Sequence, residues 1–118
     1  MILHVVLFRP RPGLSEEQRQ GLAKAFASAI DNIASIKRAR IGKRRMHGRP
    51  YEQLMRADDS HAAVLEFDDL AGLKAYLEHP VHNELGSRFF ECFEQALMYD
   101  YDVQEGHAGL NALIEEEI

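Results

Sequence analysis

The N-terminal segment Ile2-Leu3-His4-Val5-Val6-Leu7-Phe8 has the composition of a short β-strand that is apolar on both faces. Side chains alternate along a strand, so Ile2, His4, Val6 and Phe8 share one face, and Leu3, Val5 and Leu7 share the other. The prolines of Arg9-Pro10-Arg11-Pro12-Gly13 end the strand because they lack the backbone N–H that a sheet requires.

The first half of the chain predicts a helix and two further strands. Ser15-Glu16-Glu17-Gln18 fits a capping box, and an apolar helical stripe follows it at Leu22, Phe26, Ala29, Ile30 and Ile33. We expect an edge strand over about residues 38–46, a polar loop over 47–60 and a strand over 61–67.

The second half predicts two helical segments and a last strand. Asp68-Asp69 caps a helix that carries Leu70, Leu73 and Leu77, and Pro80 restarts a second helix. The apolar stripe of the second helix comprises Leu85, Phe89, Phe93 and Leu97, and His82 lies on the same stripe. Alternation then predicts a strand over 97–103.

The order β-α-β-β-α-β is typical of the ferredoxin-like α+β fold, with a four-stranded antiparallel sheet and helices on one face. Helices can cover only one of the two apolar faces of the first strand, so the other face needs a cover. We expect a homodimer through this open sheet face. The alternative is that the acidic C-terminal tail, residues 104–118, folds back over it.

Composition narrows the classes of protein further. The 118 residues predict one domain, at residues 1–103, before the tail. The net charge of −5 argues against nucleic-acid binding. A single cysteine, Cys92, excludes an internal disulfide and favours a reducing, cytoplasmic setting. The apolar stretch 1–8 is too short for a membrane span and has no basic leader, so we expect neither an anchor nor a signal peptide.

Several segments together resemble the stress-responsive dimeric α/β-barrel (Dabb) family. They are the first strand, the run Tyr76 to His82 with its Tyr-x-x-His-Pro-x-His pattern, the aromatic helix around Phe89 and the closing Tyr99-Asp100-Tyr101. The resemblance spans residues 1–102. It implies a ferredoxin-like protomer whose dimer forms a β-barrel. Most members have no assigned reaction, whereas a few, such as plant polyketide cyclases similar to olivetolic acid cyclase, are enzymes.

His82 is the first candidate for chemistry, with Tyr76 as its companion. The apolar stripe turns the imidazole toward the space between helix and sheet, and the nearby helix N-terminus disfavours its protonated form. A neutral imidazole can act as a general base, and the Tyr76 hydroxyl could bind a carbonyl or enolate oxygen. The alternative is that His82 is a hydrogen-bonded core residue.

Four further residues are candidates for the same region. The resemblance to the cyclases implies that the strand face of His4 is the helix-covered one, so that Leu3, Val5 and Leu7 lie on the open face and His4 could meet His82. The alternative is that His4 is a buried histidine satisfied by a backbone carbonyl. The resemblance also places His61 at a pocket, although the antiparallel pairing puts it toward the other end of the sheet from His4. Phe26, which stands where the plant cyclases have a tyrosine, and Phe89 complete the ligand-binding candidates.

The histidine pair around Pro80 and a basic stretch are weaker indications of function. His79 and His82 could chelate a metal, but Pro80 breaks their common helical face, so we expect no metal site and no cofactor. The basic stretch from Lys37 to Arg56 could bind an acidic ligand or nucleic acid, but we favour the alternative that it protects an edge strand from aggregation. Two functions remain: a homodimeric protein of unassigned activity that binds a small apolar ligand, and a cofactor-free, cyclase-like lyase that uses His82 as its base.

Overall fold

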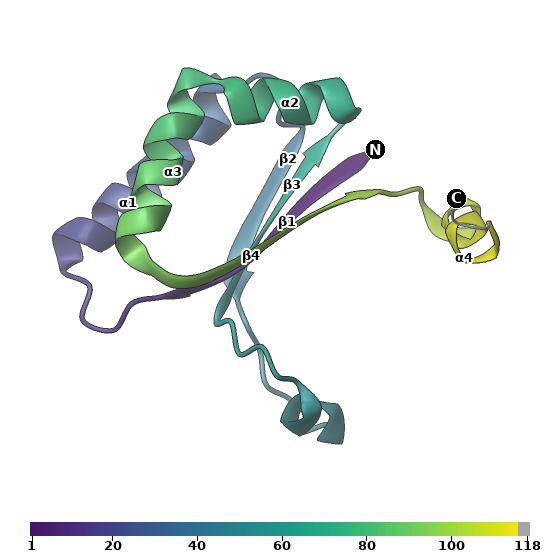
Figure 1. Ribbon diagram of the computed structural model, residues 1–118, viewed down its shortest axis with the longest axis horizontal. Helices are drawn as coiled ribbons and strands as arrows, with labels where there is room; N and C mark the ends of the chain where they lie inside the picture. The colour runs from purple at the N-terminus through teal and green to yellow at the C-terminus, as the bar shows by residue number, and fades with distance from the viewer. Residues whose placement is uncertain (116–118) are drawn as a thin grey trace.

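The computed structural model describes residues 1–115 and contains a four-stranded antiparallel sheet in the order β2-β3-β1-β4 (Figure 1). The strands are β1 (Ile2–Pro10), β2 (Arg38–Lys43), β3 (His61–Phe67) and β4 (Phe93–Asp102). The predicted alternation of β1 is confirmed: Ile2, His4, Val6 and Phe8 are buried, and Leu3, Val5 and Leu7 are only half-buried. The fold is ferredoxin-like α+β, as the element order predicted.

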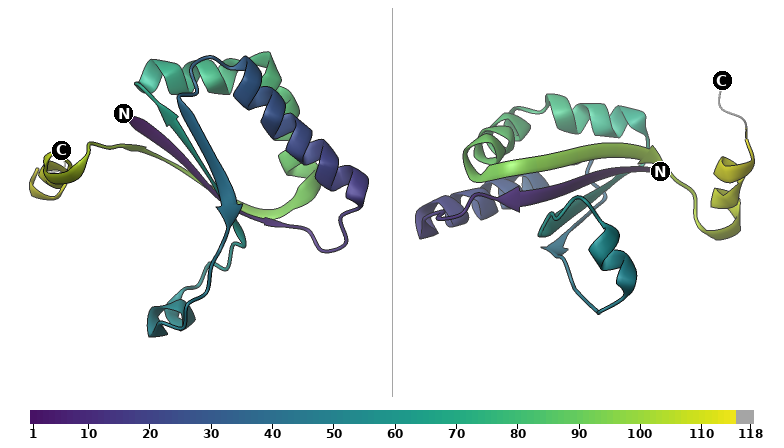
Figure 2. Two further views of the ribbon diagram at one scale, coloured as in Figure 1. Left: turned by 180° about the vertical axis from the view of Figure 1, so that it is seen from behind. Right: turned by 60° about the horizontal axis from the view of Figure 1, so that its bottom comes forward.

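Three helices cover one face of this sheet (Figure 2). They are α1 (Glu16–Asn32), α2 (Leu70–Glu78) and α3 (Pro80–Cys92). The predicted capping box at Ser15 and Gln18 is present, and the Asp69 side chain caps α2. Pro80 begins α3, as predicted, and the Nδ1 atom of His79 accepts the Val81 N–H at 3.1 Å. The corner between α2 and α3 is therefore held by a proline and a side-chain cap.

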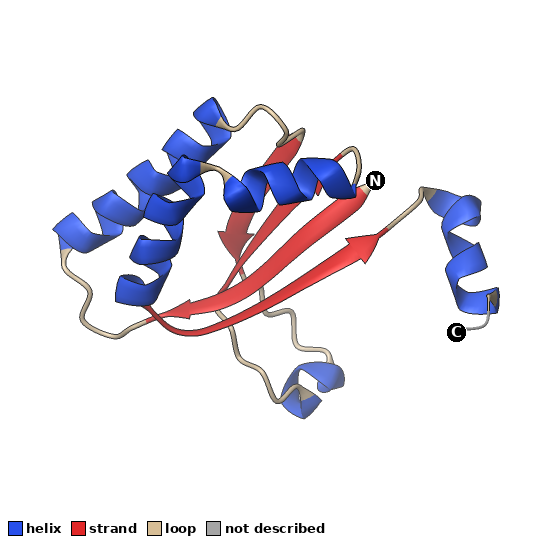
Figure 3. Ribbon diagram, turned by 45° about the horizontal axis from the view of Figure 1, so that its top comes forward, coloured by secondary structure: helices blue, strands red, loops and turns tan. Residues whose placement is uncertain are grey.

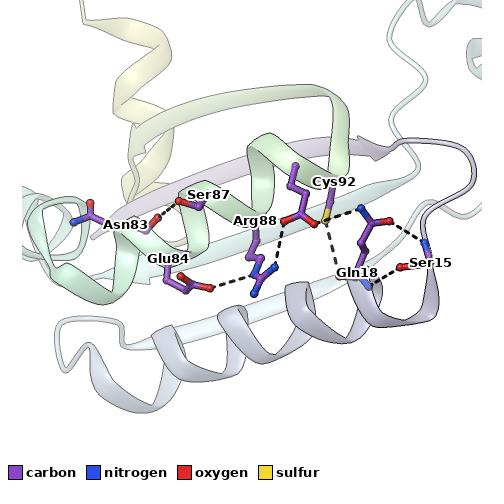
Figure 4. Close-up of polar contacts among 8 residues, drawn as sticks. Ser15, Gln18, Asn83, Glu84, Ser87, Arg88 and Cys92 are labelled. Atoms are coloured by element: carbon purple, nitrogen blue, oxygen red, sulfur yellow. Dashed lines mark hydrogen bonds and ion pairs between the residues drawn. The ribbon is translucent and has the colours of Figure 1, made fainter.

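Polar contacts fix α3 against α1 (Figure 4). The Arg88 guanidinium pairs with Glu84 at 3.1 Å and with Glu91 at 3.2 Å. Gln18 of α1 donates to Glu91 at 3.3 Å, and its backbone oxygen accepts from the fully buried Cys92 thiol at 3.9 Å. The two Arg88 ion pairs lie within α3, and the two contacts from Gln18 tie the C-terminal end of α3 to the start of α1.

The end of α3 differs from the prediction. The helix stops at Cys92, so Phe93 and Leu97 belong to β4 rather than to a helical stripe, and β4 begins before residue 97. Phe93 is buried, whereas Leu97 faces the open side of the sheet opposite Leu7. Pairing with the whole length of β1 outweighs the local helical spacing, which extends by chance across the boundary.

The predicted strand over 38–46 and the loop after it also need correction. β2 ends at Lys43, and residues 44–60, here called the arm, project from the end of the sheet away from the helices (Figure 3). The arm contains a 3-10 helix, η1 (Pro50–Leu54), which the polar composition did not predict. Gly48, which lies in the arm just before η1, has a φ of +89°, a left-handed conformation that glycine adopts without strain.

The tail leaves the end of β4, far from the arm (Figure 1). The last bond to the sheet is from Val103 N–H to the Met1 carbonyl at 2.9 Å. A 3-10 helix, η2 (Gly106–Leu110), and a short helix, α4 (Asn111–Ile114), follow. The described part of the tail does not fold back over the open face, and Glu116, Glu117 and Ile118 lie outside the described residues.

Most buried apolar side chains lie between the helices and the sheet, with Phe67 and Cys92 fully enclosed. Ile30, predicted on the buried stripe of α1, is instead 43% exposed because it lies at the flank of the helix. Within residues 1–115, no helix has the length and apolar character needed to cross a bilayer.

Candidate functional site

A cavity of about 250 Å³ lies between the sheet and the helices α2 and α3. Its polar side chains are His4 from β1, Tyr76 from α2 and His82 from α3. The rest of its wall is apolar: Val6, Phe26, Ala63, Leu65, Leu77, Leu85, Gly86, Phe89, Phe90 and Met98. The structure therefore brings the three predicted catalytic candidates to one apolar cavity.

The bend between α2 and α3 sets the mutual arrangement of Tyr76 and His82. Tyr76 lies near the end of α2, and His82 lies in the first turn of α3. Their rings meet edge to face with centroids 4.7 Å apart. On its other side the Tyr76 ring lies 5.8 Å from the His4 ring. Sequence spacing alone could not establish this contact because the Pro80 corner interrupts the helical repeat.

His4 forms a close pair with Asp100, a residue that the sequence analysis did not single out. The two residues face each other across β1 and β4, and His4 Nδ1 lies 2.6 Å from Asp100 Oδ1. An ionised carboxylate can only accept, so Nδ1 of His4 is the donor in this pair. This carboxylate partner replaces the backbone carbonyl that we considered for a buried His4. The sequence shows an aspartate in the predicted last strand, but only the strand register shows that it lies opposite His4.

Burial tunes the protonation of the cavity residues. Tyr76 is 3% exposed, and burial raises its pKa to about 12, so the hydroxyl stays protonated and can donate a hydrogen bond at neutral pH. The pKa of His82 is lowered, first by its partial burial and then by the neighbouring His4. His82 is half-buried rather than enclosed, so it remains in contact with the cavity opening. The site thus pairs a neutral imidazole with a neutral phenol.

Of the other predicted ligand-binding residues, Phe26 and Phe89 line the cavity and His61 does not. The Phe26 and Phe89 rings pack 5.4 Å apart and form one end of its wall. His61 lies opposite Phe8, four positions along β1 from His4, where it stacks on the Phe8 ring at 5.4 Å. It lines a separate groove of about 360 Å³ beside α1.

His61 is held in that groove by its neighbours. Its Nδ1 atom lies 2.7 Å from the Ser60 hydroxyl. Its pKa is lowered, mainly by partial burial and further by the positive charges of Lys43 and Arg19. The separation from His4 was predicted from the antiparallel pairing and is confirmed by the register.

The mouth of the cavity is apolar and opens beside β4, the edge strand of the sheet. Phe90 is 88% exposed, Met98 is 53% exposed and Leu77 is 40% exposed. These three residues were not predicted as part of the site, because periodicity identifies a buried stripe and not the rim of an opening.

The histidines near Pro80 are not arranged as a metal site. His79 caps α3 through Nδ1, so this nitrogen is engaged with the backbone. Within residues 1–115, no group of three or more His, Cys, Asp or Glu side chains is placed to hold a metal ion.

The family model of the stress responsive A/B barrel domain, Dabb, matches residues 2–103. The chain therefore belongs to the Dabb family. No curated protein matches the sequence.

Solved structures with the same fold come from plants and bacteria. A protein from Arabidopsis thaliana has 23% identity and a TM-score of 0.73, over 90% of this chain and 98% of its own. The hydroxynitrile lyase of Passiflora edulis has 22% identity and a TM-score of 0.71, over 89% and 94%. A dimeric ferredoxin-like protein of unknown function from Thermobifida fusca has 20% identity and a TM-score of 0.66, over 86% and 90%. At these identities the similarity establishes the fold alone.

Proposed function

We propose that the cavity binds a small, largely apolar ligand that carries one carbonyl or hydroxyl group. The observation that supports this proposal is an apolar cavity interrupted by only three polar side chains, His4, Tyr76 and His82. Apolar walls with a few convergent polar groups are the usual composition of small-molecule sites. The volume of about 250 Å³ favours a short-chain or single-ring molecule.

A matched pair of probes tests this proposal. Acetophenone and ethylbenzene have nearly the same shape, but only acetophenone has a carbonyl that could accept a hydrogen bond from Tyr76. In NMR titrations we expect both to shift resonances of cavity residues. The Tyr76→Phe substitution should weaken the binding of acetophenone by about fivefold to tenfold, because one hydrogen bond is lost, and leave the binding of ethylbenzene unchanged. The control is Tyr51→Phe on the arm. Shifts confined to residues outside the cavity would contradict the proposal.

A second candidate function is a cofactor-free lyase or cyclase reaction with His82 as general base. It is favoured by the lowered pKa of His82 beside the protonated Tyr76 hydroxyl. His82 would take a proton from a carbon next to a carbonyl, and Tyr76 would donate a hydrogen bond to the enolate oxygen that forms. The shared fold of the Passiflora edulis lyase shows that this scaffold can support an enzyme.

Hydrogen exchange of a ligand tests the second candidate directly. In D2O, the methyl protons of acetophenone should exchange faster with the protein than with buffer alone. His82→Ala should reduce the rate to that of buffer, whereas His79→Ala, which removes a capping imidazole outside the cavity lining, should retain it. Equal exchange rates with wild type and with His82→Ala would contradict the role of His82 as a base and favour ligand binding without catalysis.

We also infer that the chain forms a homodimer through the open sheet face. Leu3, Val5 and Leu7 are half-buried in the single chain, and Tyr99 and Tyr101 on the same face are 51% and 52% exposed. An apolar surface of this kind favours association with a second copy. The similar Thermobifida fusca protein is described as dimeric, which agrees with this inference.

A further inference from the structure

The C-terminal tail is folded locally but has exposed apolar side chains. Leu110, Leu113 and Ile114 are 49%, 83% and 77% exposed. The turn before them is tight: a Cβ on Gly109 would lie 2.6 Å from the Gln104 carbonyl oxygen. A short helix that presents large apolar side chains to solvent lacks the surface that would bury them.

A hollow of matching character lies at the opposite end of the sheet. Its volume is about 640 Å³, and it lies between the arm and the open face. Leu7, Ala62 and Val64 line it from the sheet, and Met55 and Ala57 line it from the arm. Its apolar wall could therefore receive two or three aliphatic side chains.

The charges of the tail and the hollow are opposite. The tail, residues 104–118, contains four glutamates and no lysine or arginine. Arg40, Lys43, Arg44 and Arg56 surround the hollow. Arg40 and Arg44 pair with Glu66 and Asp58, whereas Lys43 and Arg56 have no ion pair among residues 1–115.

One buried polar atom in the hollow also lacks a partner. Asp59 is 8% exposed, and its Oδ1 atom accepts from the Gln95 side chain at 3.0 Å. Its Oδ2 atom is buried without a hydrogen-bond partner in the described chain. This oxygen is enclosed by the chain itself, so the occupant of the hollow does not have to supply its donor.

We propose that the tail of each subunit seats Leu110, Leu113 and Ile114 in the hollow of the partner subunit, with Glu115 near Lys43 and Arg56. The tail of the same chain lies at the other end of the sheet and cannot be the occupant in this conformation (Figure 1). A two-fold axis between stacked sheets can bring the tail end of one copy over the arm end of the other. This exchange rests on the proposed homodimer and adds a second contact to it.

Truncation separates this inference from the homodimer itself. Sedimentation equilibrium should show that the full chain and residues 1–103 each form a dimer. The dimer affinity of the truncated chain should be lower by about 30-fold or more, because the burial of aliphatic side chains is lost. A full chain that is monomeric would overturn both the homodimer and the exchange. A full chain and a truncated chain with equal dimer affinity would overturn the exchange alone.

Disulfide trapping then identifies the partner surface. Chains with Leu113→Cys and longer, tagged chains with Met55→Cys are mixed and oxidised; Cys92 is fully buried and out of reach of the oxidant. We expect a disulfide between one chain of each kind, with a mass between those of the two homodimers. Leu54→Cys is the matched control, because Leu54 is 75% exposed on the arm but does not line the hollow. Equal trapping with Leu54→Cys, or no disulfide between the Leu113→Cys and Met55→Cys chains, would overturn the proposal.

Discussion

His4 Nδ1 and Asp100 Oδ1 lie 2.6 Å apart, although the two residues are 96 positions apart in the chain. The pair joins the central strand β1 to the edge strand β4, and its histidine faces the cavity that also contains Tyr76 and His82. A carboxylate that holds one ring nitrogen determines which nitrogen of a neutral imidazole is free. A single contact between strands thus orients a side chain of the site.

Asp100→Asn tests this pair. The amide keeps the shape of the side chain but loses the charge, so the unfolding free energy should fall by about 1 kcal/mol. In wild type, long-range nitrogen–proton NMR spectra should show His4 protonated at Nδ1. Asp102→Asn is the control, because Asp102 is an 80% exposed side chain on the same strand. A wild-type His4 protonated only at Nε2 would contradict the assigned pair.

The lowered pKa of His82 predicts how stability depends on pH. The unfolded chain, with an ordinary imidazole pKa of about 6.5, takes up a proton before the folded chain does. His82 therefore makes its full contribution to the unfolding free energy above pH 6.5. This contribution is lost as pH falls from there toward the lower pKa of the folded state. His61 should act in the same direction, since its pKa is also lowered.

Urea unfolding at pH 7.5 and pH 5.5 checks this sign. Wild type should lose more stability between the two values than His82→Gln does. His107→Gln, which removes an exposed histidine of the tail, controls for the loss of an imidazole in general. An NMR titration in which His82 has a midpoint above 6.5 would contradict the prediction.

Val5→Asp tests the open sheet face. Val5 lies between Leu3 and Leu7 on that face, so a dimer through this surface would bury the new carboxylate without a partner at a cost of several kcal/mol. Sedimentation velocity at micromolar concentration should show a dimer for wild type and a monomer or unfolded chain for the variant. Ala96→Asp is the control, because Ala96 is exposed on the helix-side face opposite Phe8. A Val5→Asp protein that remains dimeric would place the interface elsewhere.

Gly21→Ala is expected to stabilise the protein by about 0.5 kcal/mol, since alanine is the better residue inside a helix. Gly21 lies within α1, and a Cβ there would be 3.4 Å from Cζ of Arg88, whose flexible side chain can shift slightly. The change is measured by urea unfolding. Gly109→Ala provides the contrast: its Cβ would meet a backbone oxygen at 2.6 Å, so it should disturb the tail turn. A destabilised Gly21→Ala variant would show that Arg88 cannot move.

Local patterns predicted much of the fold and part of the site. Alternation in β1 grouped His4 with Val6 and Phe8 on one face, and Pro80 with the stripe of α3 placed His82 at the start of a helix that faces the sheet. These are properties of residues close in the chain, where strand and helix periods are set by backbone geometry. The same local reasoning extended α3 through Phe93 and Leu97, because it could not see that β1 would pair with this segment.

The sequence by itself determined the order of the strands and helices, the apolar faces of β1 and the identity of three cavity side chains. Only the tertiary structure decided which of these residues meet. Strand register brought Asp100 to His4 and left His61 opposite Phe8, and the bend at Pro80 brought Tyr76 against His82. The physical reason is that periodicity describes the direction of a side chain within its own element. Contact between elements depends instead on pairing register and helix packing, which are settled by the free energy of the whole fold.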